Sequence, residues 1–132
     1  MGLSGPSTRV PLASSAESCR LARGTVRQLL DRADVDADTR DTAVLLATEL
    51  ASNAIEHGGG PALLDAYVRA DAIRIAVADP SPVLPTPRPI ADTADELSER
   101  GRGLLLVAAL ASRWGAEPHA HGKTVWCEID LA

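Results

Sequence analysis

The sequence predicts an α+β fold, a two-layer α/β sandwich with helices on one face of a mixed, mostly antiparallel sheet. The order of expected elements is β-α-α-β-β-loop-α-β-β, which keeps the helices apart from the hairpins. The chain has 132 residues, 45% hydrophobic and 23% charged, which fits one domain over residues 1–132. Since the chain has no Phe, its core must consist mainly of Leu, Val, Ile and Ala.

The composition excludes several classes of function. The net charge is −5, no basic face or tail stands out, and aromatic residues make up 2%, so we expect no nucleic-acid partner. No apolar run reaches the ~18 residues that a membrane span needs. Cys19 and Cys127 cannot form a disulfide framework, so we expect a cytoplasmic protein. Lys123 is the single lysine among the basic residues, and this preference for Arg, with many Ala, is typical of a GC-rich bacterial genome.

The N-terminal part predicts a tail, a strand and a helix. Residues 1–7 are small and polar and are expected to be a flexible tail, and Thr8–Leu12 is a short strand. Ser14 or Ser15 is expected to cap the helix. Its apolar stripe follows the spacing of one helix face and consists of Ala22, Val26, Leu29, Leu30 and Ala33.

A second helix and a hairpin follow. The helix is expected to start near Asp36–Thr39 and to run to His57, because Gly58–Pro61 offers a left-handed cap and then a proline. Apolar residues alternate over 64–70 and again over 73–77, which predicts an antiparallel hairpin with a turn between the two strands.

The C-terminal part begins with a segment that has no periodicity. Residues 79–100 hold five prolines within ten positions and then an acidic stretch, and so long a segment without structure is usually functional or mobile. Leu104–Ser112 predicts a third helix, apolar on nearly every side and therefore buried. Two strands are expected last, over Trp114–Pro118 and Val125–Leu131.

The first candidate site is a row of polar residues on the second helix. Glu49 and Asn53 are four residues apart and share a helix face, and His57 extends the row. A carboxylate and an amide oxygen suit a hard cation such as Mg²⁺. The alternative is a solvated helix face, with His57 favoured by the helix C-terminus.

The second candidate is Asp79, which ends a hydrophobic strand just before the proline-rich segment. A carboxylate at this place often binds a ligand. The alternative is a plain turn, which the sequence Asp-Pro-Ser-Pro also favours.

The third candidate is Gly101-Arg102-Gly103, at the start of the third helix. Glycines there let backbone N–H groups approach a phosphate, and Arg102 adds a charged donor. The alternative is a tight turn into the helix that glycine permits.

Four motifs in order resemble those of the GHKL ATPase superfamily. Glu49–Gly58 resembles the N box, Val77–Pro82 the first glycine box, Gly101–Val107 the second, and Gly122–Trp126 the last box. The resemblance covers nearly the whole chain and is closest to the serine/threonine kinases of the anti-sigma regulatory type. It implies the Bergerat ATP-binding fold.

The resemblance also implies roles for individual residues. Glu49 would orient or deprotonate the attacking serine hydroxyl, Asn53 would ligate Mg²⁺, and Asp79 would accept a hydrogen bond from the adenine amino group. The segment 80–100 would be the ATP lid. The nucleotide-binding residues implied are Asn53, His57, Asp79, Gly101, Arg102, Gly103, Leu104 and Thr124.

The function implied is that of an Mg·ATP-dependent serine/threonine protein kinase that regulates transcription. Such a kinase phosphorylates an STAS-domain anti-anti-sigma protein, sequesters a sigma factor, and often forms a homodimer. A further possibility is that the domain was cut from a larger sensor, but no dimerisation helix or phosphoacceptor histidine motif precedes it, which argues against a complete histidine kinase. The alternative is a non-catalytic or weakly ATP-binding interaction module of the same fold.

Two positions depart from the family pattern. Ser81 stands where the first glycine box usually has glycine, and Lys123 stands where the last box usually has a small hydroxyl residue. Strand alternation places Lys123 on the same face as Val125.

Overall fold

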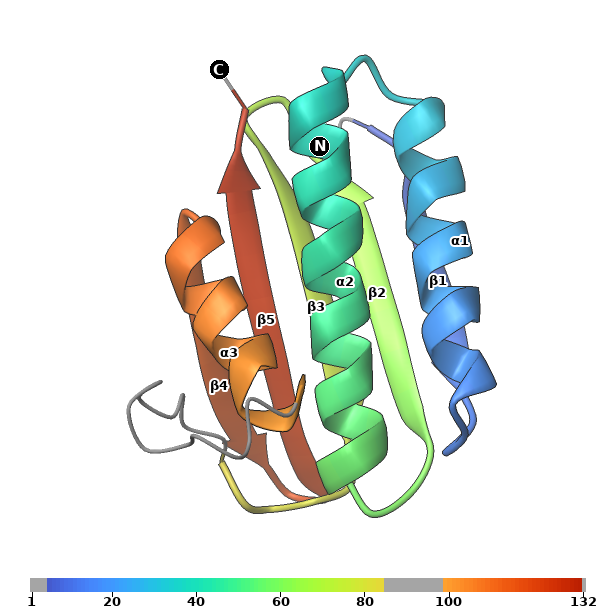
Figure 1. Cartoon of the computed structure of the whole chain (residues 1–132), viewed down its shortest axis with the longest axis vertical. Coiled ribbons are helices and arrows are strands. Elements are labelled where there is room, and N and C mark those ends of the chain that lie inside the picture. Colours follow the sequence, from blue (N-terminus) through green and yellow to red (C-terminus); the bar gives the residue numbers. More distant parts are fainter. Residues whose placement is uncertain (1–4, 85–98, 132) are drawn as a thin grey trace.

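The computed structural model describes residues 5–84 and 99–131, with the backbone alone for residues 99–103. Its elements follow the predicted order (Figure 1). They are β1 (Ser7–Leu12), α1 (Glu17–Asp31), α2 (Ala37–His57), β2 (Ala62–Val68), β3 (Ala72–Asp79), α3 (Glu99–Leu110), β4 (Arg113–His119) and β5 (Gly122–Asp130). The tail predicted for residues 1–7 gives way to β1 at Ser7, and residues 1–4 lie outside the described part.

The five strands form one open sheet in the order β1-β2-β3-β5-β4. We expected a mixed, mostly antiparallel sheet, and all four strand pairs are antiparallel. The chain connects β3 to β5 through α3 and the edge strand β4. The central pair β3·β5 therefore joins segments far apart in sequence, with Asp79 opposite Lys123 at one end and Ala72 opposite Asp130 at the other.

The three helices cover one face of this sheet, which confirms the two-layer α+β fold (Figure 1). The core lies between the layers and consists of Leu, Ile, Val, Ala and Cys127. The stripe predicted for the first helix faces this core, since Ala22, Val26, Leu29 and Leu30 are buried. None of the helices in the described part is both long and apolar enough to cross a membrane.

Helix ends agree with the sequence at α2 and differ at α1. Asp36 caps α2, because its carboxylate accepts a hydrogen bond from the Thr39 N–H at 2.8 Å, and this bond lowers the pKa of Asp36. Gly59, at a φ of 77°, takes the left-handed conformation after the helix. The cap predicted at Ser14 or Ser15 is wrong, since Ala16 holds that position with no side-chain bond.

Helix α3 also differs from its prediction. It begins at Glu99, so Gly101 and Gly103 lie inside its first two turns. Leu104 and Val107 are buried, whereas Leu110 is 44% exposed. The prediction of burial on nearly every side is wrong because α3 packs mainly against α2 and leaves its outer face to solvent.

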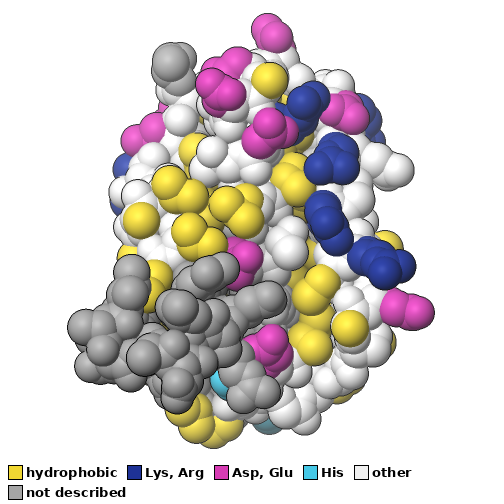
Figure 2. Space-filling view, in the orientation of Figure 1, with side chains coloured by type: hydrophobic (Ala, Val, Ile, Leu, Met, Phe, Trp, Pro, Cys, Tyr) yellow, Lys and Arg dark blue, Asp and Glu magenta, His cyan; other side chains and the backbone are white. Residues whose placement is uncertain are grey.

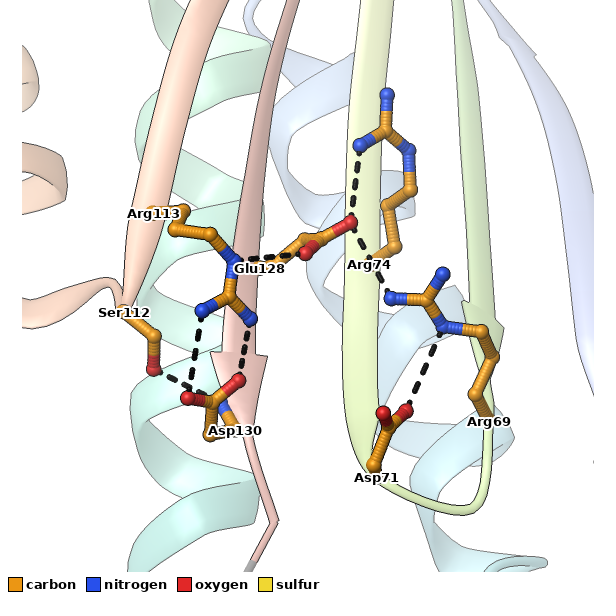
Figure 3. Close-up of polar contacts among 7 residues, drawn as sticks. All are labelled: Arg69, Asp71, Arg74, Ser112, Arg113, Glu128 and Asp130. Carbon is orange, nitrogen blue, oxygen red and sulfur yellow. Dashed lines mark hydrogen bonds and ion pairs between the residues drawn. The ribbon is translucent and has the colours of Figure 1, made fainter.

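The opposite face of the sheet carries a charged network in place of a second helix layer (Figure 3). Glu128 on β5 accepts hydrogen bonds from three arginines of neighbouring segments, Arg69 at 3.3 Å, Arg74 at 3.1 Å and Arg113 at 3.0 Å. Arg113 also pairs with Asp130. Burial tends to raise the pKa of Glu128, but its arginine partners outweigh this and lower it.

Candidate functional site

Asp79 ends β3 on the helix-covered face, with only 1% of its side chain exposed. Its Oδ1 accepts two hydrogen bonds, from the Ser81 N–H at 2.8 Å and from Lys123 Nζ at 2.9 Å. Its Oδ2 is buried and has no hydrogen-bond partner among the described residues. The turn predicted after Asp79 is therefore present at Oδ1, and Oδ2 is a buried acceptor without a donor in the described part of the chain.

Lys123 lies directly across from Asp79 on β5, and its side chain is 2% exposed. The alternation predicted for this strand is confirmed, because Lys123 and Val125 are both buried on the helix-facing side. Its partner was missed in the sequence, where the two residues are 44 positions apart. The sequence did contain a signal that Lys123 has an acidic partner. Lys123 occupies a core-facing position of an alternating strand, and a buried ammonium group requires a hydrogen-bond acceptor.

Two glycines allow the backbone to close around Asp79. A Cβ on Gly58, at the end of α2, would lie 2.8 and 2.9 Å from the Cβ and Cγ of Asp79. A Cβ on Gly122 would lie 2.7 Å from Pro80 Cα and still closer to the Asp79 carbonyl. The motif that ends at Gly58 and the motif that begins at Gly122 therefore both contact the motif that contains Asp79. The backbones approach so closely at these contacts that neither glycine position has room for a side chain.

The row Glu49, Asn53 and His57 runs along α2 toward that junction. Glu49 and Asn53 are half-buried beside the buried stripe of the helix, and His57 is exposed at the last turn. Burial raises the pKa of the Cys19 thiol on α1, and the charges of Glu56 and Glu49 raise it further. The charge of Glu49 therefore reaches the neighbouring helix α1.

The structure describes the other predicted nucleotide-binding residues to different extents. Thr124 lies on the sheet face away from Asp79, and its Oγ1 is 3.2 Å from His119 Nε2, so the structure does not bring it to the carboxylate. Leu104 is buried in α3, while the side chain of Arg102 lies outside the description, as do residues 85–98 of the predicted lid. Gly101 and Gly103 are described as helical backbone.

The residues present fit a nucleotide with a divalent cation. The unpartnered, buried Oδ2 of Asp79 suits an amino group of a base, and the amide of Asn53 is a ligand that Mg²⁺ accepts. Among the described residues, no three His, Cys, Asp or Glu side chains gather around a possible metal position. A cation here would therefore take most of its ligands from phosphate oxygens and water.

A basic stripe that the sequence did not reveal lies on α1. Figure 2 shows positively charged side chains gathered along this helix, whose exposed arginines are Arg20, Arg23 and Arg27. The expectation that no basic face stands out is wrong, because a spacing of three and four residues aligns these side chains on one helix face. The net charge hides such a local arrangement.

Comparisons with known proteins agree with this fold. Residues 12–129 match the family described as histidine kinase-like ATPase domain. The uncharacterized protein SCO4941 of Streptomyces coelicolor is 37% identical over 84 residues, covering 61% of this chain and 78% of that protein. The crystal structure of the RsbU and RsbW domains of Rv1364c from Mycobacterium tuberculosis shares the fold with a TM-score of 0.72 and 21% identity. It covers 96% of this chain, which spans 32% of that chain. Because the family match extends over most of its length, the chain belongs to the histidine kinase-like ATPase family.

Proposed function

We propose that this domain is a cytoplasmic serine/threonine protein kinase that binds Mg·ATP and phosphorylates a partner protein. The observation that carries the proposal is the buried carboxylate of Asp79 at the junction of α2, β3 and β5, whose Oδ2 has no hydrogen-bond donor in the described part of the chain. An unpaired buried acceptor is costly, and a ligand amino group would remove that cost.

The row on α2 supplies the chemistry that phosphoryl transfer needs. Asn53 would hold Mg²⁺ through its amide oxygen, and Glu49, one turn earlier on α2, would orient the hydroxyl of the substrate serine. The backbone N–H groups at the start of α3 can donate hydrogen bonds to phosphate oxygens, and the helix dipole favours a negative charge at this end of the helix. Transfer of this kind depends mainly on positioning and charge neutralisation, so this short set of residues suffices.

The partner that we propose is an STAS-domain anti-anti-sigma protein, with a sigma factor as the second partner and a homodimer as the active assembly. The resemblance of the four motifs to anti-sigma regulatory kinases supports this choice. The related fold in Mycobacterium tuberculosis carries the name RsbW and occurs in one chain with an RsbU domain. Regulation of transcription by partner exchange follows from this proposal.

A second candidate function is protein binding without catalysis. It is favoured by the ion pair of Asp79, in which Lys123 and the Ser81 N–H already use Oδ1. If this arrangement is complete without nucleotide, the domain is an interaction module of the same fold.

One experiment separates the two functions. ATP is titrated calorimetrically into the purified protein with Mg²⁺ and again with EDTA, and γ-³²P-ATP is then added with an STAS protein from the same genome. The kinase predicts Mg²⁺-dependent binding and label on one STAS serine, and a serine-to-alanine STAS variant stays unlabelled. Absence of ATP binding contradicts the nucleotide assignment. Binding without transfer favours the interaction module.

A further inference from the structure

We propose that Lys123 is a base-reading residue, which donates a hydrogen bond from Nζ to ring atom N1 of adenine beside the Asp79 carboxylate. This inference rests on the proposed function, since it requires a nucleotide at this site. It concerns a position where the chain departs from its family's usual small hydroxyl residue.

The geometry places one donor and one acceptor side by side. Asp79 and Lys123 are register partners of β3 and β5, they share the helix-facing side of the sheet, and Nζ lies 2.9 Å from Oδ1. Both side chains are almost fully buried. Their separation is therefore fixed by the strands and not by two flexible surface chains.

The hydrogen-bonding inventory shows what remains to be satisfied. Oδ1 of Asp79 already has two donors, whereas Oδ2 has none among the described residues. An ammonium group carries three donors, and the described part of the chain records one acceptor for Nζ, the Asp79 carboxylate. Within the described part of the chain, Oδ2 therefore remains an unpaired acceptor beside an ammonium group that has N–H donors left over.

This pattern is complementary to the Watson–Crick edge of adenine. The 6-amino group of adenine is a donor and the neighbouring N1 is an acceptor, so Oδ2 can receive the first and Nζ can serve the second. Guanine presents two adjacent donors, the N1–H and the 2-amino group, beside its O6 acceptor. In the orientation described for adenine, guanine would set its O6 acceptor against Oδ2 and its N1–H donor against Nζ, so both contacts would be repulsive and the pair selects adenine.

The length of the lysine side chain explains how it can replace a small hydroxyl residue. The side chain of Lys123 is 2% exposed, so its methylene groups are buried and carry the Nζ donor to the Asp79 carboxylate. The positive charge is balanced by Asp79, which keeps the pocket neutral.

The test uses base analogues with the unmodified protein, so that it does not depend on the folding of a variant. Affinities of ATP, 1-deaza-ATP, purine riboside triphosphate and GTP are measured by calorimetry in the presence of Mg²⁺. 1-Deaza-ATP keeps the amino group and lacks the N1 acceptor, so we expect its binding to be weaker by about 10- to 100-fold. GTP should bind more weakly than ATP, and the purine riboside should lose the contact with Asp79.

Lys123→Met supplies the second half of the test, with Arg74→Met as the control that removes one charge from the other sheet face. In Lys123→Met, ATP and 1-deaza-ATP should bind with equal affinity, whereas Arg74→Met should keep the difference between them.

Equal binding of the two nucleotides by the wild type would overturn the role of Lys123 and leave the proposed kinase intact. Tighter ATP binding by Lys123→Met would show that the lysine blocks the base site. Failure of the wild type to bind any nucleotide would overturn both proposals.

Discussion

Asp79 and Lys123 form a buried ion pair that joins β3 to β5, with 2.9 Å between Oδ1 and Nζ. The pair links the fold and the site, because the carboxylate that we assign to the nucleotide also holds two central strands together. Desolvation of both charges is costly, and their attraction together with the Ser81 N–H bond offsets that cost. A change in either partner should therefore be measurable in stability as well as in binding.

The first prediction concerns the stability of this pair. Lys123→Met should lower the free energy of unfolding by about 3–5 kcal/mol, because it leaves the Asp79 carboxylate buried with one partner fewer. In the double variant Asp79→Asn, Lys123→Met, the loss should be smaller than the sum of the two single losses. Urea denaturation of the four proteins gives the coupling energy.

An exposed ion pair provides the control for this cycle. Arg9 on β1 and Asp65 on β2 pair at 2.7 Å, with 70% and 40% of their side chains exposed. Arg9→Met should cost far less stability than Lys123→Met, since solvent screens such pairs. Equal losses from Lys123→Met and Arg9→Met would contradict the importance that we assign to burial.

The second prediction concerns the contact of Gly58 with Asp79. Gly58→Ala should lower stability by about 1–3 kcal/mol and weaken ATP binding, because the new Cβ would lie 2.8 Å from Asp79 Cβ and still closer to the Ala54 carbonyl oxygen. The matched control is Gly24→Ala in α1, where an added Cβ meets no atom within 4 Å. That change should stabilise the helix by about 0.5–1 kcal/mol, so a stability gain in both variants would exclude the predicted clash.

The sequence was informative wherever one local rule decides the structure. Alternation defined the β2–β3 hairpin, and the Asp36 cap and the glycines after His57 defined both ends of α2. At α1 the same kind of rule failed, because Ser18 donates its hydroxyl to the Ala13 carbonyl at 2.7 Å and the chain turns one residue after Ser15. Local capping preferences are weak at the start of α1, so tertiary packing determines which residue occupies the N-cap position.

The candidate site could be predicted only in part, since it depends on strand pairing. Glu49, Asn53 and Asp79 stood out by residue type and position, but the pairing of Asp79 with Lys123 arises from the β3·β5 register. A strand that returns after a helix and an edge strand can pair in several ways, and no pattern within either strand specifies its partner. The contact between Gly58 and Asp79 has the same long-range origin.

The third prediction separates the two roles on α2. Asn53→Ala should abolish the Mg²⁺-dependent part of ATP binding, because it removes the amide oxygen that we assign to the cation. Glu49→Ala should keep nucleotide affinity and lower the rate of transfer to the STAS serine by about 100- to 10,000-fold, as expected for a lost general base. Single-turnover transfer with γ-³²P-ATP measures the second effect, and calorimetry with and without EDTA measures the first.

A control at the other end of the sheet makes these results specific. Asp71 lies between β2 and β3, next to Ala72, which pairs with Asp130 at the end of the β3·β5 ladder opposite Asp79, and its side chain is 85% exposed. Asp71→Asn therefore removes a carboxylate without touching α2 and should leave both binding and transfer unchanged. If Asn53→Ala binds Mg·ATP as tightly as the wild type, the cation assignment is wrong. A normal transfer rate in Glu49→Ala would remove the general base from the mechanism.

The last prediction concerns the charged network on the uncovered sheet face. The pKa of Glu128 lies below its ordinary value of 4.5, because its arginine partners outweigh the effect of burial. A group with a lowered folded-state pKa stabilises the protein above its unfolded pKa and loses that contribution as the pH falls through the folded value. Glu128→Gln should therefore cost about 1–2 kcal/mol near pH 7, a value reduced by the exposure of Arg69 and Arg113.

The difference in unfolding free energy between Glu128→Gln and the wild type should stay constant down to about pH 5 and shrink toward pH 3. Urea denaturation across this range measures it, with Asp71→Asn, whose side chain is 85% exposed, as the control that should show almost no difference. A loss of equal size at pH 7 and pH 3 would mean that Glu128 acts through packing, since its charge would then contribute nothing to the stability of the sheet.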